Sequence, residues 1–302
     1  MKWSDHAQRV DLRAATAAVC VVLVWSTSFS FARDAVQQMG PWTFRFYSTL
    51  AGFMTVLPFV RRSWLEVLQL QAATRQRVLW AVTINGTMVS SLNILALAYY
   101  PATTVLTLMY TMPAFAGAME AVRLGRWSWG GVLATGAALS GVLLYVGGAP
   151  AGGALLIVLN AALWAVGTLL SARTGQPCRP STLVTVQMLI AFLCSIPLLA
   201  LAGGQGESLP PWQGRGNVLA LLYVGVLNGP VVFGLRYVAI QGLGPVRAAS
   251  FTLGVPVVGA LAAVLAFGET LDWWQAAGIG LVVLGMALRL RGVAAPANGA
   301  TR

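Results

Sequence analysis

Charged residues are scarce in this chain of 302 residues: they make up 9% of it, whereas soluble domains carry about 25%. Hydrophobic residues make up 58%, and the mean hydropathy is +0.75. Six stretches lack Asp, Glu, Lys and Arg altogether, namely 14–32, 78–119, 127–172, 180–206, 216–235 and 248–268. Because a spanning helix needs about 20 apolar residues, these stretches exclude a soluble globule and predict a multi-pass membrane protein.

Histidine and cysteine are also rare, which excludes several kinds of chemistry. The one histidine, His6, lies in the N-terminal tail, so none is available at membrane depth for a metal site or an activated nucleophile. Cys20, Cys178 and Cys194 have spacings that suit neither a disulfide framework nor a zinc site. We therefore expect no enzyme activity, no metal and no cofactor. The net charge of +11 comes from scattered arginines, so we expect no nucleic-acid partner.

Proline, glycine and charge divide the chain into ten predicted transmembrane helices. They cover residues 14–32, 43–60, 78–98, 103–122, 130–147, 153–171, 182–202, 216–236, 246–267 and 273–290. With the N-terminus in the cytoplasm, sixteen Lys and Arg residues, Arg236 among them, fall on the cytoplasmic side and three on the outer side. Such an excess is typical of cytoplasmic loops. We predict that both termini are cytoplasmic and that the protein lies in the inner (plasma) membrane.

Residues recur in order at a nearly constant spacing, which indicates an internal repeat. The matched pairs are Trp25 and Trp164, Pro41 and Pro180, Pro58 and Pro197, Asn85 and Asn228, Gly86 and Gly229, Pro113 and Pro256, Gly136 and Gly280, and Gly141 and Gly285. We predict two five-helix units, 14–147 and 153–290, between cytoplasmic tails at 1–13 and 291–302. Because five is odd, the second unit enters the membrane from the opposite side, as in transporters built from inverted repeats.

Several of these segments resemble the EamA branch of the drug/metabolite transporter superfamily. The resemblance rests on the ten helices in two halves, the Trp-Ser-Thr-Ser segment at 25–28, a proline followed by Arg45, and the Gly-Glu-Thr-Leu-Asp-Trp turn at 268–273. The first half departs from it with Gly-Arg-Trp at 125–127, where an acid is expected. The aromatic-rich segments are similar to those of bacterial amino-acid exporters, including exporters of aromatic amino acids. Phosphate-binding carriers of a related branch use membrane lysines, and the one lysine here is Lys2.

The resemblance implies an alternating-access transporter that exports small metabolites, and we expect amino acids with aromatic or other apolar side chains. Glu120 is the one carboxylate inside a predicted helix, and it either couples protons or pairs with Arg123 or Arg126 at the membrane surface. We favour a uniporter, or facilitator. The alternative is a proton-coupled exporter of toxic lipophilic cations, held by cation–π contacts. Arg45 either reaches the lipid head groups or meets substrate at the outer mouth.

Uncharged polar and aromatic residues at membrane depth are the candidate substrate ligands, because such groups need partners inside the bundle. They are Trp25, Asn85, Met88, Tyr99, Tyr110, Asn160, Trp164 and Asn228. The alternative for the asparagines is hydrogen bonding between helices. For the aromatic residues it is packing, or anchoring at the membrane surface. A pocket of this kind suits a small neutral or zwitterionic molecule.

Proline and glycine positions predict where the bundle bends and packs. Candidate hinge or gating residues are Pro101 and Gly244, in equivalent connections, and Pro113 and Pro256, inside the fourth and ninth helices. Small residues at Gly136, Ser140, Ala276 and Gly280 predict close packing of the fifth and tenth helices, within one chain or between two. We expect a monomer in the lipid bilayer to form a complete pathway, and a dimer is compatible with the sequence.

Overall fold

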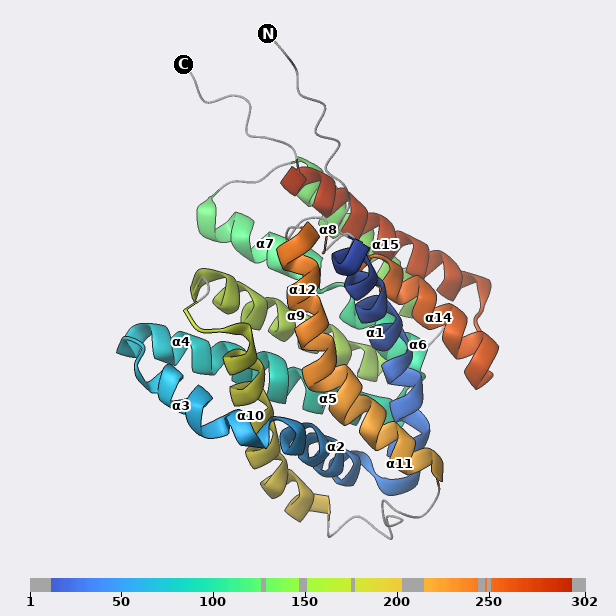
Figure 1. The fold of residues 1–302 in the computed structure, drawn as a ribbon. Helices are drawn as coiled ribbons and strands as arrows, with labels where there is room; N and C mark the ends of the chain where they lie inside the picture. Colours follow the sequence, from blue (N-terminus) through green and yellow to red (C-terminus); the bar gives the residue numbers. More distant parts are fainter. Residues whose placement is uncertain are drawn as a thin grey trace, which may run out of the picture.

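The computed structural model describes residues 12–125, 129–146, 151–174, 177–202, 215–243, 248 and 251–294. These residues form helices joined by short turns, and none of them lies in a β-strand. Figure 1 shows the helices packed into a bundle, in which the first helix begins and the last helix ends on the same side. The predicted hinge residue Gly244 and the chain ends at 1–11 and 295–302 lie outside the described residues.

The first half of the chain forms eight α-helices. They are α1 (Leu12–Met39), α2 (Pro41–Val56), α3 (Val60–Leu68), α4 (Ala72–Thr83), α5 (Val89–Tyr99), α6 (Ala102–Met109), α7 (Met112–Leu124) and α8 (Trp129–Val146). A 3₁₀ turn, η1 (Leu57–Phe59), joins α2 to α3, and a π-helical segment, η2 (Ile84–Met88), joins α4 to α5. The turn before α2 depends on Gly40, whose φ of 80° suits glycine, and on Pro41 at the first helical position.

The second half repeats this plan with fewer interruptions among the described residues. Its helices are α9 (Ala151–Thr174), α10 (Pro180–Ala202), α11 (Arg215–Leu222), α12 (Val232–Leu243), α14 (Gly254–Phe267) and α15 (Trp273–Ala294). A second π-helical segment, η3 (Tyr223–Val231), joins α11 to α12. Figure 1 shows α11 and α12 as one long rod that runs beside α1.

Six helical segments of the described chain are long and apolar enough to cross a membrane. They are Leu12–Met39, Ala72–Tyr99, Ala102–Leu124, Ala154–Thr174, Pro180–Ala200 and Gly216–Leu243. Three further apolar helices are shorter, at Trp129–Tyr145, Gly254–Phe267 and Trp273–Leu288. An all-helical, multi-pass arrangement is therefore present, whereas the count of ten spans and the cytoplasmic termini stay predictions.

The first helix of each half packs on elements of the other half. In the first half, α1 packs against α12, η3 and α14, and in the second half α9 packs against α4, α5 and α7. The Ser26 hydroxyl of α1 donates to the carbonyl oxygen of Val255 on α14, at 3.2 Å. The Asn160 amide of α9 donates to the carbonyl oxygen of Val89 on α5, at 3.1 Å. The two halves therefore interlock, and neither buries its polar groups alone.

Helices α8 and α15 pack closely, as predicted, but through other residues than expected. A Cβ atom on Gly141 would come within 2.7 Å of the Gly278 carbonyl oxygen, and one on Gly285 would come equally close to that of Ala134. By contrast, Gly136 and Gly280 have no atom within 4 Å of a Cβ position. Small residues occur on two faces of each helix, and spacing alone does not tell which face is buried.

Both prolines predicted to kink helices lie next to real breaks. Helix α6 ends at Met109, and α7 begins at Met112 with Pro113 in its first turn. Helix α14 likewise begins two residues before Pro256, after a turn at Thr252. Proline fits a first helical turn because the N–H group that it lacks would have no partner there. The role of these breaks in gating stays a prediction.

The repeated Asn-Gly pairs both lie in π-helical segments. Asn85 and Gly86 are in η2, and Asn228 and Gly229 are in η3. Gly229 has φ −92° and ψ −115°, outside the helical region, and Pro230 follows it. Single π-helical turns inside α-helices occur frequently at functional sites. Each half therefore has an irregular backbone segment in the middle of its third helical rod.

Candidate substrate site

The break between α6 and α7 places an aromatic pair between the two halves. Tyr110, which follows the last residue of α6, is 5% exposed and packs edge to face on Trp164 of α9. The ring centroids are 5.8 Å apart, and the planes meet at 88°. Trp164 is only half buried, and Trp25 packs against the same core cluster that contains Tyr110. Tyr110 and Trp164 are thus in direct contact, and Trp25 packs on the same hydrophobic core.

The predicted asparagines divide into two kinds. Asn160 is 2% exposed, and its Nδ2 donates to the Val89 carbonyl and, at 2.9 Å, to Asn93 Oδ1. Asn160 therefore makes hydrogen bonds between helices, which was the predicted alternative to substrate binding. Asn85 and Asn228 are half buried, and the side-chain oxygens of all three asparagines have no partner in the described part of the chain. All three oxygens are buried, and that of Asn85 packs against Gly167 of α9.

Arg45 lies elsewhere than the sequence suggested. Its side chain is buried, at 7% exposure, and its Nη2 donates to the carbonyl oxygen of Gly86 in η2 at 2.7 Å. The guanidinium therefore serves the irregular π-helical backbone and does not reach the head groups or the outer mouth. The expectation failed because the direction of a long side chain depends on the neighbouring helix, which the local sequence does not specify.

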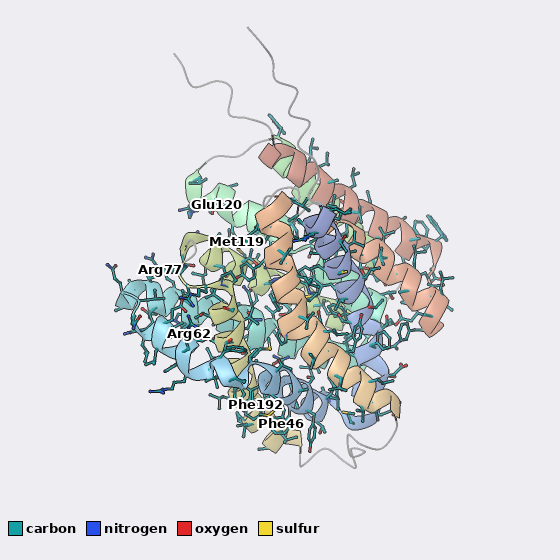
Figure 2. All side chains as sticks on the ribbon, viewed as in Figure 1. Phe46, Arg62, Arg77, Met119, Glu120 and Phe192 are labelled. Atoms are coloured by element: carbon teal, nitrogen blue, oxygen red, sulfur yellow. The ribbon has the colours of Figure 1, made fainter. Side chains whose placement is uncertain are left out.

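Glu120 pairs with two arginines near the end of α7. Its carboxylate bonds to Arg123 on the same helix and lies 3.7 Å from Nη2 of Arg173 on α9. The pairing with Arg123 was one of its two predicted roles; Arg126, the other predicted partner, lies outside the described residues, and Arg173 was missed. Figure 2 shows Glu120 near the end of α7, away from Phe46 and Phe192 where α2 meets α10.

The remaining predicted residues are more exposed. Met88 is 41% exposed and Tyr99, at the end of α5, is 71% exposed. Within the described chain no ring contact joins Tyr99 to the aromatic pair, so its position fits anchoring at the membrane surface. Pro101 directly precedes α6.

Arg236 is a site residue that the sequence analysis missed. The analysis ended the eighth span at residue 236 and counted this arginine among the cytoplasmic charges, whereas α12 continues to Leu243. Arg236 is therefore two helical turns inside the rod, and it lies within electrostatic range of the hydroxyl groups of Tyr110 and Tyr237. A charged residue in an otherwise apolar span was the available signal.

Glu269 joins three segments at the opposite end of the bundle. Its carboxylate accepts hydrogen bonds from the backbone N–H groups of Ala102 and Thr103, at 2.8 and 3.2 Å, and from the Thr103 hydroxyl at 2.7 Å. It also forms an ion pair with Arg33 of α1 at 3.0 Å. A carboxylate at a helix N-terminus is favourable because it satisfies free N–H groups. The turn after α14 thereby fixes the start of α6.

Glu66 makes a similar junction between α3 and the start of α10. It accepts a hydrogen bond from the Thr182 hydroxyl at 2.6 Å and one from the Arg179 N–H at 3.0 Å. These two bonds lower the pKa of the carboxyl group, the Thr182 bond having the larger effect. Glu66 therefore stays ionised at neutral pH and has a structural partner.

Comparison with known proteins gives a consistent family. The EamA-like transporter family matches the chain twice, over residues 12–147 and 151–291. An uncharacterized transporter of Archaeoglobus fulgidus is 23% identical over 275 residues, which are 88% of this chain and 93% of that protein. An uncharacterized protein of Pseudomonas aeruginosa is 34% identical over 157 residues, about half of each chain. A solved crystal structure matches with a TM-score of 0.61 at 19% identity, covering 93% of this chain and 99% of that one.

Proposed function

Because this chain belongs to the EamA-like transporter family, we propose that it exports small metabolites, and in particular amino acids with aromatic or other apolar side chains. The observation that supports this substrate class is the Tyr110–Trp164 pair, to which each half of the chain contributes one residue. Transporters built from repeats bind substrate where the halves meet, next to interrupted helices. An aromatic surface together with a few polar groups suits a molecule with an apolar side chain and a polar backbone.

We further propose that transport is passive, as in a facilitator. Proton coupling normally uses a carboxylate at membrane depth. Among the described residues, Glu66, Glu120 and Glu269 are each bonded at the ends of helices, and Asp34 and Asp272 are exposed. No carboxylate of the described chain therefore lies beside the aromatic pair, which supports facilitated export from the inner membrane.

A single chain is proposed to contain the complete pathway. Helices α8 and α15, whose small residues were candidates for a contact between two chains, pack on each other within one chain. The surfaces around their buried glycines are therefore covered within one chain, and no second copy is needed to cover them. This supports a monomer as the transporting unit.

Flux in proteoliposomes tests the proposal. We expect labelled phenylalanine to equilibrate down its gradient at a rate that an imposed proton gradient leaves unchanged. Trp164→Ala removes the edge-to-face contact and its buried area, so flux should fall about tenfold, corresponding to about 1.4 kcal/mol. Trp129→Ala is the matched control, because Trp129 is 85% exposed on α8.

Two outcomes would contradict the proposal. Accumulation of phenylalanine driven by the proton gradient would exclude a facilitator. Absence of phenylalanine flux together with flux of tetraphenylphosphonium would favour the alternative cargo, a lipophilic cation.

A further inference from the structure

The position of Arg236 follows from the faces of α12. Leu235, Ala239 and Leu243 of this helix belong to a cluster with residues of α1. Phe233 and Tyr237 belong to another cluster, with residues of α2 and α10. At 100° per residue, Arg236 falls between these two packed faces.

The surface-exposed face of α12 lies on the other side of the helix. Val231 and Val238 are 41% and 46% exposed, and Arg236 is about 140° and 160° away from them around the helix axis. Its side chain therefore starts from the side of α12 that faces the interior of the bundle, not from the side that faces lipid.

Arg236 is nevertheless exposed, unlike its neighbours on the same face. Val232, one turn before it, is 0% exposed, and Ala239, one turn after it, is 2% exposed. The Tyr110 hydroxyl lies within electrostatic range of the guanidinium. An exposed side chain on an otherwise buried, inward face indicates a solvent-accessible space between the helices, within electrostatic range of Tyr110.

The charge of Arg236 has no protein counter-ion in the described chain. The carboxylates of Glu120 and Glu269 pair with other arginines, and Glu66 bonds to α10. A second interior arginine, Arg45, also lacks a carboxylate partner and bonds only to a backbone carbonyl. An unpaired cation inside a membrane bundle is costly, and such residues commonly mark substrate pathways. The interior therefore attracts an anionic group and repels a cationic one.

We propose that Arg236 binds the carboxylate of the transported molecule, while Tyr110 and Trp164 contact its apolar side chain. This inference rests on the proposed function for the identity of the cargo, but the subsite itself requires only a carboxylate on an aromatic or aliphatic body. Arginine suits this role because its planar guanidinium can donate two parallel hydrogen bonds to one carboxylate. The subsite selects organic acids and amino acids over lipophilic cations.

Binding of two labelled probes to the purified protein in detergent tests the subsite. One probe, 3-phenylpropionate, has the carboxylate without an ammonium group. The other, phenylalaninamide, has the ammonium group without a carboxylate. The wild-type protein should bind phenylpropionate at least tenfold more tightly. Arg236→Gln should weaken phenylpropionate binding at least tenfold and leave phenylalaninamide binding unchanged or tighter, while Arg236→Lys should retain part of the preference.

Controls separate recognition from folding. Arg77→Gln removes an exposed arginine of α4 and should change neither binding constant. Arg236→Gln should unfold at the same temperature as the wild type or higher, because no ion pair is lost. Equal loss of both probes in Arg236→Gln, or absence of phenylpropionate binding to the wild type, would overturn the inference.

The same experiment distinguishes failure of the subsite from failure of the proposed cargo. If phenylpropionate binding depends on Arg236 but phenylalanine is not transported, the carboxylate subsite stands and the amino-acid cargo is wrong. If phenylalanine is transported while both probes bind Arg236→Gln as they bind the wild type, the cargo stands and the subsite is wrong.

Discussion

Individual polar residues in this bundle differ mainly in whether the protein supplies their partner. Asn160 and Arg45 make hydrogen bonds to backbone carbonyl oxygens of neighbouring helices. Within the described residues Arg236 makes no hydrogen bond, and the side-chain oxygens of Asn85, Asn160 and Asn228 have no partner. Since a polar group without a partner is costly in an apolar medium, the unpartnered groups are the better candidates for contact with substrate.

Glu269 shows the opposite case, a fully partnered carboxylate whose removal should destabilise the protein. Its side chain is 8% exposed and bonds to Arg33, Ala102 and Thr103. Glu269→Ala leaves buried N–H groups and an arginine unpaired, so we expect a loss of roughly 2 kcal/mol in stability. Thermal unfolding in detergent should show a lower midpoint. Asp272→Ala, which alters an exposed acid of the same turn, should leave the midpoint unchanged, and equal midpoints for both variants would refute this role.

The helical elements are irregular at equivalent places in the two halves. The Asn-Gly pairs lie in π-helical segments, and the prolines Pro113 and Pro256 follow breaks in the next helices. Local sequence explains these features, since proline removes a helical hydrogen bond and glycine tolerates non-helical backbone. The features occur in both halves, as expected for a repeated unit.

The α8–α15 contact gives a test of packing with a control on the same helix. A Cβ atom on Gly141 would meet the Gly278 carbonyl oxygen and the Val282 nitrogen at 2.7 and 2.8 Å. Gly141→Ala should therefore separate the helices and reduce stability by roughly 1–3 kcal/mol. Gly136→Ala has open space and should be neutral, or stabilising by up to about 1 kcal/mol through helix propensity. Chemical denaturation in detergent measures both, and equal destabilisation by the two variants would exclude the contact.

The α8–α15 contacts are reciprocal, and this reciprocity indicates how the two halves of the molecule are related. Gly141 meets Gly278 and Val282, and Gly285 meets Ala134 and Ala138. Shifting each residue number by 144 converts one set of contacts into the other: Gly141 corresponds to Gly285, Ala134 to Gly278 and Ala138 to Val282. A contact in which two equivalent surfaces exchange roles is the signature of a two-fold relation. Helices α8 and α15 therefore pack as symmetry-related partners of the two halves.

An inverted two-fold relation makes a prediction about membrane orientation. From the excess of arginine on one side of ten predicted spans, we predict that both termini are cytoplasmic. Green fluorescent protein fused to either end should fluoresce, and alkaline phosphatase fused to either end should be inactive. Phosphatase inserted between residues 202 and 215, in a predicted outer connection, should be active and serves as the control. Termini on opposite sides would indicate an odd number of spans and exclude the inverted repeat.

The sequence by itself determined the membrane class, the family and the positions of the helix breaks. Hydropathy, proline and glycine act through the local backbone and the surrounding solvent, so they can be interpreted without knowing any neighbour. It also nominated Tyr110 and Trp164, because aromatic residues at membrane depth are conspicuous in a chain with so little polarity. It placed Glu120 next to Arg123, since residues three apart share a helix face.

Only the tertiary structure decided which polar side chains have partners. Arg45 bonds to Gly86 and Asn160 to Val89, and Arg236 lies near Tyr110, so each depends on a helix distant in the sequence. Arg236 and Tyr110 belong to different halves, 126 residues apart. Whether a long side chain meets a carboxylate, a carbonyl oxygen or open space is fixed by packing between such helices. For that reason the sequence nominated Tyr110 and Trp164 but not Arg236, an inward-facing arginine without a carboxylate partner in the described chain.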